Sequence, residues 1–143
     1  MSKKIVVTSA IAIVLAIWLL WPNAVTNTNT EVTISEIEHR RETWISALEW
    51  CESRGKNSAL NPEDRDGTPS YSNFQWKPST FLYFGKQYGL IATSTSLAEV
   101  PELLKNYELQ RDIVRHMVPD KTVNWYNQFP DCVKTKVGLP PVL

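Results

Sequence analysis

The sequence predicts a small, mainly α-helical domain that follows one N-terminal apolar helix, or an α+β domain if a polar flap forms a β-hairpin. Apolar residues recur at helical spacing in three separate stretches between residues 34 and 118. A polar segment, residues 57–71, is rich in turn-forming residues and separates the first two stretches. The rest of the chain has almost no alternating strand pattern, and 143 residues leave room for one domain.

The N-terminal segment is an uncharged apolar run over residues 5–21, preceded by Lys3 and Lys4. As a helix this run spans about 25 Å, enough for a thin bilayer, and the lysines favour the cytoplasmic side. A cleavable signal peptide is the alternative, although Ala24 is the only small residue well placed for cleavage. We expect an uncleaved signal anchor over residues 1–22 in the cell membrane, with the C-terminal domain outside the cytoplasm. If the segment is cleaved, the domain is secreted.

The remainder of the chain divides into a linker, a domain and a tail. Residues 23–33 are rich in Thr and Asn and lack an apolar period, which is typical of a linker. Residues 34–133 carry the periodic stretches and form the predicted domain, and residues 134–143 form a predicted C-terminal tail. The full chain has 15 basic and 15 acidic residues, so without Lys3 and Lys4 it has 13 against 15, about −2. This charge and the lack of a basic block argue against a nucleic-acid partner.

The first predicted helix runs from residue 34 to the vicinity of Gly55, a residue that suits a helix end. A capping box of Ser35 and Glu38, or an alternative one of Thr33 and Glu36, opens it. Mainly apolar residues that recur in steps of three and four form one stripe along this helix. The stripe runs through Ile34, Ile37, Arg41, Trp44, Ile45, Leu48 and Cys51.

The second and third predicted helices follow the polar segment. Pro78 opens a helix over residues 80–88, which Gly89 ends. A capping box of Ser96 and Glu99 precedes the third helix, which we expect to continue without interruption to about residue 118.

The two cysteines, Cys51 and Cys132, lie at the end of the first helix and in an aromatic segment, residues 124–132, that closes the fold. Outside the cytoplasm an isolated pair is expected to form a disulfide. Two free buried thiols, and less favourably a catalytic or metal-binding cysteine, are the alternatives. Closing a loop of about 80 residues would stabilise the fold by about 4–5 kcal/mol through the unfolded state.

Metal and cofactor sites are not expected. Two cysteines are too few for a typical zinc site. His39 and His116 have no neighbouring ligand pattern, so we expect them on helix surfaces. The sequence also contains no phosphate loop and no Ser-His-Asp order.

Glu52 lies in the last turn of the first helix, next to its buried face, and is the candidate catalytic acid. A carboxylic acid in an apolar pocket can keep its proton near neutrality and deliver it to the leaving oxygen of a glycosidic bond. From spacing alone, a solvated helix-end glutamate is the competing interpretation. Glu49, one turn earlier, is a second candidate, but its place off the apolar stripe predicts a solvated side chain. Asp64 and Asp66 could supply a second carboxylate, although turn capping is the favoured explanation for them.

Gln75 is the candidate hydrogen-bond donor to a substrate. Tyr71, Phe74 and Trp76 surround it and offer aromatic faces for sugar contact. Packing in the hydrophobic core is the competing interpretation of these aromatic residues.

Three motifs occur in a recognisable order: Cys51-Glu52-Ser53, then Phe74-Gln75-Trp76, then Ser79-Thr80-Phe81. This order resembles the resuscitation-promoting factor domain, a compact member of the lysozyme-like lytic transglycosylase superfamily. The family pattern is roughly W-x-x-x-A-x-C-E-S-G-G, a polar segment, and Y-x-G-G-L-Q-F-x-x-S-T-W. Further on, Glu108-Leu109-Gln110, Trp125, Pro130 and Cys132 are similar to the family's closing helix and its W-P-x-C end. The resemblance covers most of residues 40–133.

The resemblance implies a lysozyme-like fold over residues 34–133 and a cell-wall glycosidase activity. It implies that Glu52 is the catalytic acid/base, that Gln75 contacts the substrate, and that Cys51 and Cys132 form the family's disulfide. The substrate would be the MurNAc–GlcNAc β-1,4 linkage of peptidoglycan glycan strands, cut by lytic transglycosylation or by hydrolysis. Beside Gln75 we expect Tyr71, Asn73, Phe74, Trp76 and Trp125 to bind the substrate.

Two departures from the family pattern concern the substrate groove. Arg54 replaces the first glycine after C-E-S, and Ser72-Asn73 stand where two glycines precede the hydrophobic residue and Gln. A non-catalytic wall-binding module on the same fold is one alternative function, and a structural envelope protein is another. The structural alternative predicts a fully solvated Glu52.

Overall fold

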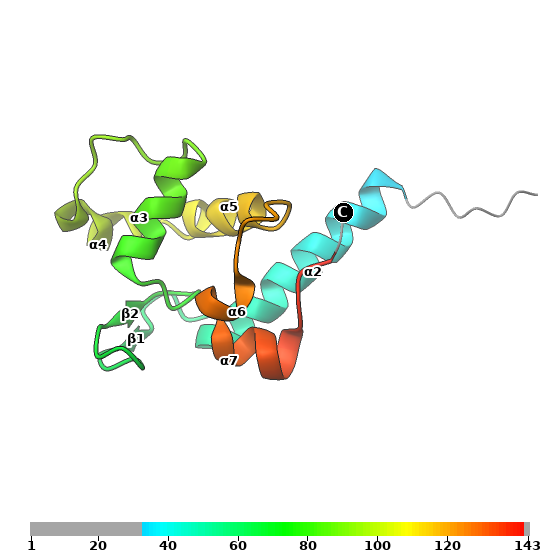
Figure 1. Ribbon diagram of the computed structural model, residues 1–143, viewed down its shortest axis with the longest axis horizontal. Coiled ribbons are helices and arrows are strands. Elements are labelled where there is room, and N and C mark those ends of the chain that lie inside the picture. Colours follow the sequence, from blue (N-terminus) through cyan, green and yellow to red (C-terminus); the bar gives the residue numbers. More distant parts are fainter. Residues whose placement is uncertain (1–32, 142–143) are drawn as a thin grey trace, which may run out of the picture. The chain divides into compact units, whose positions relative to one another are not determined.

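The computed structural model describes residues 33–141, which are mainly helical, as predicted (Figure 1). Three helices of ten or more residues correspond to the three predicted stretches. They are α2 (Ile34–Ser53), α3 (Pro78–Gln87) and α5 (Tyr107–Met117). Two short strands, β1 (Leu60–Asn61) and β2 (Ser70–Tyr71), lie between α2 and α3. The shorter helices of this part of the chain are η1 (Leu97–Glu99), α4 (Val100–Leu103), α6 (Trp125–Gln128), α7 (Pro130–Cys132) and η2 (Val133–Val137).

The N-terminal predictions fall outside the described residues. They concern the signal anchor or signal peptide over residues 1–22 and nearly all of the linker over residues 23–33. Within residues 33–141, no helix combines the length and the apolar character needed to cross a bilayer. Residues 33–141 belong to one compact unit.

Helix α2 carries Glu52 in its last turn. Thr33 and Glu36 form the capping box that opens the helix, so the alternative box is correct and Ser35 lies inside the helix. The helix ends where Arg54 adopts the left-handed conformation, with φ of 59°. Trp44, Ile45 and Leu48 of the predicted stripe are buried, whereas Ile34 is 80% exposed.

The polar segment forms a β-hairpin, which decides between the two predicted possibilities. Leu60 pairs with Tyr71, and Asn61 pairs with Ser70, in antiparallel register. A further antiparallel bridge joins Tyr71 to Trp76, so a tight turn follows the hairpin directly. In Figure 1 the hairpin lies at the C-terminal end of α2.

The third predicted helix is divided, which corrects the prediction of one uninterrupted element. Asn106 interrupts it, because its side chain accepts a hydrogen bond from the Leu109 backbone N–H (3.1 Å) and so opens α5. The break leaves the Leu104 carbonyl able to accept hydrogen bonds from Ser72 Oγ (3.1 Å) and Gln110 Nε2 (2.8 Å). A polar connection therefore joins the turn after the hairpin to the start of α5.

The C-terminal segment is more regular than predicted. Helix η2 continues to Val137, which packs against the hydrophobic core. The indole N–H of Trp44 donates to the Gly138 carbonyl (3.2 Å) and fixes the chain after this helix to α2. Residues 134–137, predicted as part of the tail, therefore belong to the domain.

The hydrophobic core includes Trp44, Ile45 and Leu48 of α2 and aromatic residues from α3 and the C-terminal helices. The Trp76 ring centroid lies 5.7 Å from that of Phe81 and 5.8 Å from that of Phe129. Cys51 and Cys132 form the predicted disulfide, with their Cα atoms 5.8 Å apart. Helix α7 is thereby held against the end of α2.

Candidate active site

Glu52 is half-buried in the last turn of α2. Burial, together with the negative charges of Asp131 and Asp64, raises the pKa of its carboxyl from 4.5 to about 7, against the opposing charge of Lys136. A carboxyl with this pKa is about half protonated near neutrality. It can therefore donate a proton and then accept one within the same reaction.

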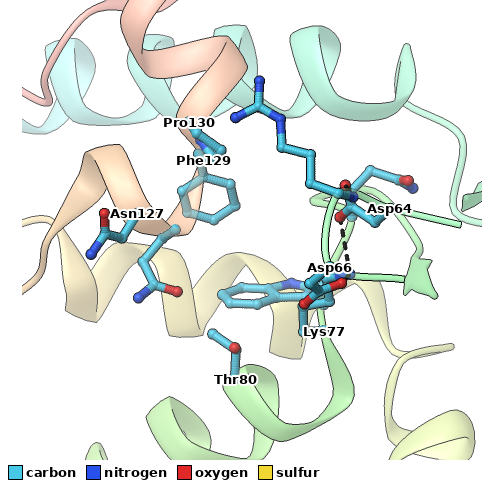
Figure 2. A pocket seen from close by; sticks show the side chains of 11 residues that line it. Asp64, Asp66, Lys77, Thr80, Asn127, Phe129 and Pro130 are labelled. Carbon is cyan, nitrogen blue, oxygen red and sulfur yellow. Dashed lines mark hydrogen bonds and ion pairs between the residues drawn. The ribbon is translucent and has the colours of Figure 1, made fainter. Parts of the chain in front are cut away.

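A pocket of about 320 Å³ opens between the hairpin loop, the start of α3 and the segment from α6 to α7 (Figure 2). Asp64 lines this pocket, and Asp131 directly follows Pro130, which lines it too. Glu52 is not among the lining residues, and its connection to this region is electrostatic, through the negative charges of Asp64 and Asp131. Polar side chains form most of the remaining wall, namely Arg65, Asp66, Thr80, Asn127 and Gln128.

Lys77 binds the acidic residues of the pocket. Its Nζ lies 3.1 Å from Asp64 Oδ2 and 2.7 Å from Asp66 Oδ1. Asp66 also accepts hydrogen bonds from the Thr68 backbone N–H (3.0 Å) and hydroxyl (2.7 Å), as turn capping predicts. The backbone N–H of Arg65, together with the Lys77 ammonium, holds the pKa of Asp64 below its ordinary value. Asp64 is therefore a carboxylate near neutrality.

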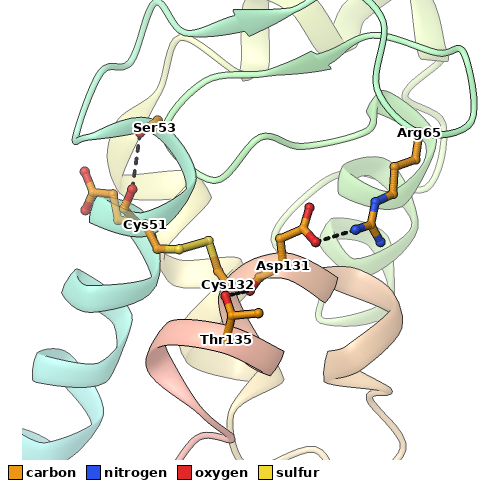
Figure 3. Close-up of a disulfide and its surroundings, with 7 residues drawn as sticks. Cys51, Ser53, Arg65, Asp131, Cys132 and Thr135 are labelled. Carbon is orange, nitrogen blue, oxygen red and sulfur yellow. Dashed lines mark hydrogen bonds and ion pairs between the residues drawn. A yellow bond between two sulfur atoms is a disulfide. The ribbon is translucent and has the colours of Figure 1, made fainter.

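An ion pair between Arg65 and Asp131 connects the hairpin loop to α7 (Figure 3). Both side chains are exposed, so the pair contributes at most about 1 kcal/mol to stability. Figure 3 shows Asp131 beside the disulfide and turned toward Arg65. The pair therefore ties the hairpin loop to the residue next to Cys132.

Gln75 lines the pocket and ends the tight turn of residues 72–75. Its backbone is left-handed, with φ of 48°, and its N–H donates to the Ser72 carbonyl (3.1 Å). The side-chain Oε1 accepts from Ser70 Oγ (3.1 Å), and Nε2 donates to the Ser72 carbonyl (3.0 Å). The structure thus brings Gln75 to the pocket and fixes its amide there.

Three of the residues predicted to bind the substrate are buried and do not line this pocket. Phe74 is 0% exposed, Asn73 is 2% exposed and Trp125 is 6% exposed. Phe74 belongs to the hydrophobic core, and Trp125 packs edge-on against Trp44 with 5.0 Å between ring centroids. Both side chains therefore contribute to the core, because their large apolar surfaces stabilise the fold when they are removed from water.

The other two aromatic candidates differ from each other. Trp76 is almost fully buried and packs in the core, yet part of its side chain lines the pocket. Tyr71 is half-buried and packs against the core, and it does not line the pocket. Only Trp76 of this pair is therefore placed to form part of the pocket wall.

Glu49 is buried, which corrects the prediction of a solvated side chain. Its Oε1 accepts a hydrogen bond from Asn73 Nδ2 (2.6 Å). Its Oε2 accepts from the Tyr107 hydroxyl (3.0 Å) and from Arg111 Nη1 (3.2 Å). Because these donors occupy both oxygens and Arg111 supplies the counter-charge, Glu49 is unsuited to donate a proton. Glu52 remains the candidate acid.

Asp131, Arg65 and Lys77 were not predicted from the sequence as residues of this region. One signal for Asp131 was present, because it adjoins Cys132 just as Glu52 adjoins Cys51. A disulfide between the two cysteines requires these two carboxyl groups to lie in the same part of the fold. Arg65 and Lys77 carried no such signal, since both come from irregular segments whose path depends on the hairpin.

The two histidines are exposed, His39 on α2 and His116 on α5, as expected. Among residues 33–141, no group of three or more His, Cys, Asp and Glu side chains is arranged to hold a metal ion.

Comparisons of the chain with protein-family models, with curated proteins and with solved structures gave no match.

Proposed function

We propose that this chain cleaves peptidoglycan glycan strands at the MurNAc–GlcNAc β-1,4 linkage, with Glu52 as the single catalytic acid/base in a lysozyme-like domain. The observation that carries this proposal is the carboxyl of Glu52, which is half-buried at a helix end and has a pKa of about 7. Protonating a glycosidic oxygen requires an acid that keeps its proton near neutrality, and burial supplies one.

In the proposed reaction, Glu52 donates its proton to the glycosidic oxygen while the bond from this oxygen to the anomeric carbon breaks. The resulting carboxylate removes a proton from a hydroxyl of the same sugar, and the hydroxyl oxygen bonds to the anomeric carbon. This closes an anhydro ring, and the proton returns to Glu52. If water replaces the sugar hydroxyl, the same two proton transfers hydrolyse the linkage.

A single catalytic carboxyl is sufficient for the intramolecular route, because the substrate supplies its own nucleophile. Asp64 is bound by Lys77, and Asp131 is paired with Arg65. We assign both aspartates an electrostatic role: they raise the pKa of Glu52, and their negative charge favours the oxocarbenium-like transition state.

The pocket that Asp64 and Gln75 line has features that suit a sugar. Its volume of about 320 Å³ lies at the lower end of the range of small-molecule sites. Thr80, Asn127 and Gln128 offer hydroxyl and amide groups to sugar hydroxyls, and Phe129 and Pro130 offer an apolar wall. The proposal includes a membrane anchor over residues 5–21 and a domain outside the cytoplasm, where a disulfide persists.

The burial of Glu52 also favours an enzyme over the two alternatives. A structural envelope protein predicts a fully solvated glutamate, whereas this one is half-buried. A wall-binding module without turnover would gain nothing from a carboxyl whose pKa is raised to about 7, because the raised pKa lowers stability near neutrality.

Digestion of purified glycan strands with the full chain tests the proposal. We expect soluble fragments with anhydro ends for transglycosylation or with reducing ends for hydrolysis, identified by mass spectrometry. Glu52→Gln should lower the rate by about 10²–10⁴-fold. Glu63→Gln, which changes an exposed carboxyl of the hairpin loop, is the matched control and should keep the wild-type rate. Absence of products from the wild type at every pH would overturn the proposal.

A further inference from the structure

We propose that Glu49 is a positioning residue that holds Gln75 at the pocket through Asn73. It acts on the turn of residues 72–75 and not on the proton transferred by Glu52. Its effect on the fold is independent of catalysis, whereas its effect on glycan binding rests on the proposed function.

The first argument is that Glu49 is a buried charge with a specific partner in the turn. Its Oε1 accepts from Asn73 Nδ2 at 2.6 Å, and Asn73 is itself 2% exposed. Arg111 and Tyr107 satisfy the other oxygen, so the charge is compensated inside the fold. A buried carboxylate of this kind fixes the groups that bind it, because each lost hydrogen bond would leave an unsatisfied ion.

The second argument is that the contact between α2 and α5 is already provided by another residue. Glu42, two turns before Glu49 on α2, binds Arg111 Nη2 and Arg115 Nε, each at 2.7 Å. Both arginines belong to α5, so these ion pairs join the two helices without Glu49. Glu49 also contacts Tyr107 and Arg111 of α5, but its hydrogen bond to Asn73 of the turn is a contact that Glu42 does not make.

The third argument is that the turn needs anchors. Ser72 and Gln75 both have left-handed backbones, with φ of 65° and 48°. This conformation is unfavourable for a residue with a side chain, and it persists only where surrounding contacts enforce it. Ser72 is held by its Oγ bond to the Leu104 carbonyl (3.1 Å), and Asn73 is held by Glu49.

Gln75 depends on this turn for its position. The side-chain amide donates to the Ser72 carbonyl, within the turn itself, and the same side chain lines the pocket. Without the Asn73 anchor the turn can open, Gln75 leaves the left-handed conformation, and its amide moves away from the pocket. Glu49 thereby links the helix that carries Glu52 to the turn that carries Gln75.

Amide hydrogen exchange of the full chain tests the structural part. The Gln75 amide donates to Ser72 within the turn, and the Trp76 amide donates to the Tyr71 carbonyl across it. In Asn73→Ala we expect both to exchange at least about tenfold faster relative to α5 amides such as Ile113. Glu49→Ala should do the same, and Glu49→Gln, which keeps an acceptor for Asn73, should restore most of the protection. Glu42→Gln is the matched control. It weakens the α2–α5 contact but should not change the exchange rates of the Gln75 and Trp76 amides relative to those of α5.

Binding of a soluble β-1,4-linked N-acetylglucosamine oligomer to the inactive Glu52→Gln chain tests the functional part. Asn73→Ala and Gln75→Ala should each weaken binding about three- to tenfold, and the double variant should be no weaker than Gln75→Ala alone, because one residue acts through the other. Additive losses, or unchanged exchange of the turn, would overturn the positioning role while leaving the enzyme proposal intact. Faster exchange of the turn without any oligomer binding would support the positioning role and count against the enzyme proposal.

Discussion

Glu52 directly follows Cys51 and Asp131 directly precedes Cys132, so the disulfide holds these two carboxyl groups in the same part of the domain. After burial, the negative charge of Asp131 is the largest cause of the raised pKa of Glu52. The bond that stabilises the fold therefore also helps to set the acidity of the proposed catalytic residue.

The first prediction concerns this charge. Asp131→Asn should lower the pKa of Glu52 from about 7, but not to 4.5, because burial is the larger cause and remains. Less Glu52 is then protonated near neutrality, so the alkaline limb of kcat/KM should move to lower pH. NMR titration of the Glu52 carboxyl measures the shift directly. Asp112→Asn, which changes a carboxyl on α5, should leave the titration unaltered, and an unchanged pKa in Asp131→Asn would contradict the assignment.

The second prediction concerns the disulfide. Reduction should lower the free energy of unfolding by about 4–5 kcal/mol, because the open chain gains entropy when it unfolds. It should also lower the pKa of Glu52, since α7 and Asp131 are no longer tied to the end of α2. Urea unfolding and carboxyl titration of the oxidised and reduced protein measure the two effects. The double variant Cys51→Ala and Cys132→Ala should match the reduced protein and should not respond to reductant, and equal unfolding midpoints would refute the prediction.

Features that depend on local sequence could be predicted. The spacing of Trp44, Ile45 and Leu48 placed the buried face of α2, because an α-helix repeats every 3.6 residues. Dipeptides that end in proline or glycine within residues 57–71 indicated a hairpin or flap. Two isolated cysteines indicated a disulfide. The roles of Glu52 and Gln75 rested on the resemblance; the structure places Gln75 in the pocket wall, whereas Glu52 is not among the lining residues.

Features that depend on distant residues could not be predicted. Glu49 was expected in solvent because its partners, Tyr107 and Arg111, are 58 and 62 residues away in the chain. Phe74 and Gln75 are neighbours in one turn, yet only the backbone conformation of that turn decides which side chain enters the core. The helix break at Asn106 is a local event, but a helix-interior Asn and a capping Asn look alike in sequence.

The third prediction follows from the raised pKa of Glu52. Between about pH 4.5 and about pH 7 the folded state retains a proton that the unfolded state has released, so the free energy of unfolding falls as the pH rises through this window. Glu52→Gln removes the titration. We expect it to be more stable than the wild type by about 1–3 kcal/mol above about pH 7, and nearly equal to it below about pH 4.5. Urea unfolding at both ends of the window measures this.

Glu63→Gln serves as the control for that experiment, because it also exchanges a glutamate for its amide, at an exposed site. It should show no gain of stability that grows with pH. If Glu52→Gln were less stable than the wild type at high pH, the carboxylate would be stabilised by the fold, and the assigned direction of the pKa shift would be wrong.

The fourth prediction concerns Arg54, which stands where the similar family has glycine. Its backbone has φ of 59°, a conformation that costs less for glycine than for any residue with a Cβ. Arg54→Gly and Arg54→Ala both remove the guanidinium that lies over the Trp50 ring at 5.7 Å, so their difference isolates the backbone. We expect Arg54→Gly to be the more stable by about 1 kcal/mol. Thermal unfolding of both variants measures the difference.

Inside the helix, alanine should be more stable than glycine, the opposite of the order expected at position 54. At Ala47, an exposed position of α2, the wild-type alanine should be more stable than Ala47→Gly by about 1 kcal/mol, because glycine loses more backbone entropy in a helix. If glycine is the more stable residue at position 54 and alanine at position 47, the effect at position 54 comes from its left-handed backbone. A helix end that merely tolerates any substitution would not show this reversal. Alanine favoured at both positions would mean that α2 continues past Ser53, which would turn Glu52 away from the helix end that the proposed mechanism requires.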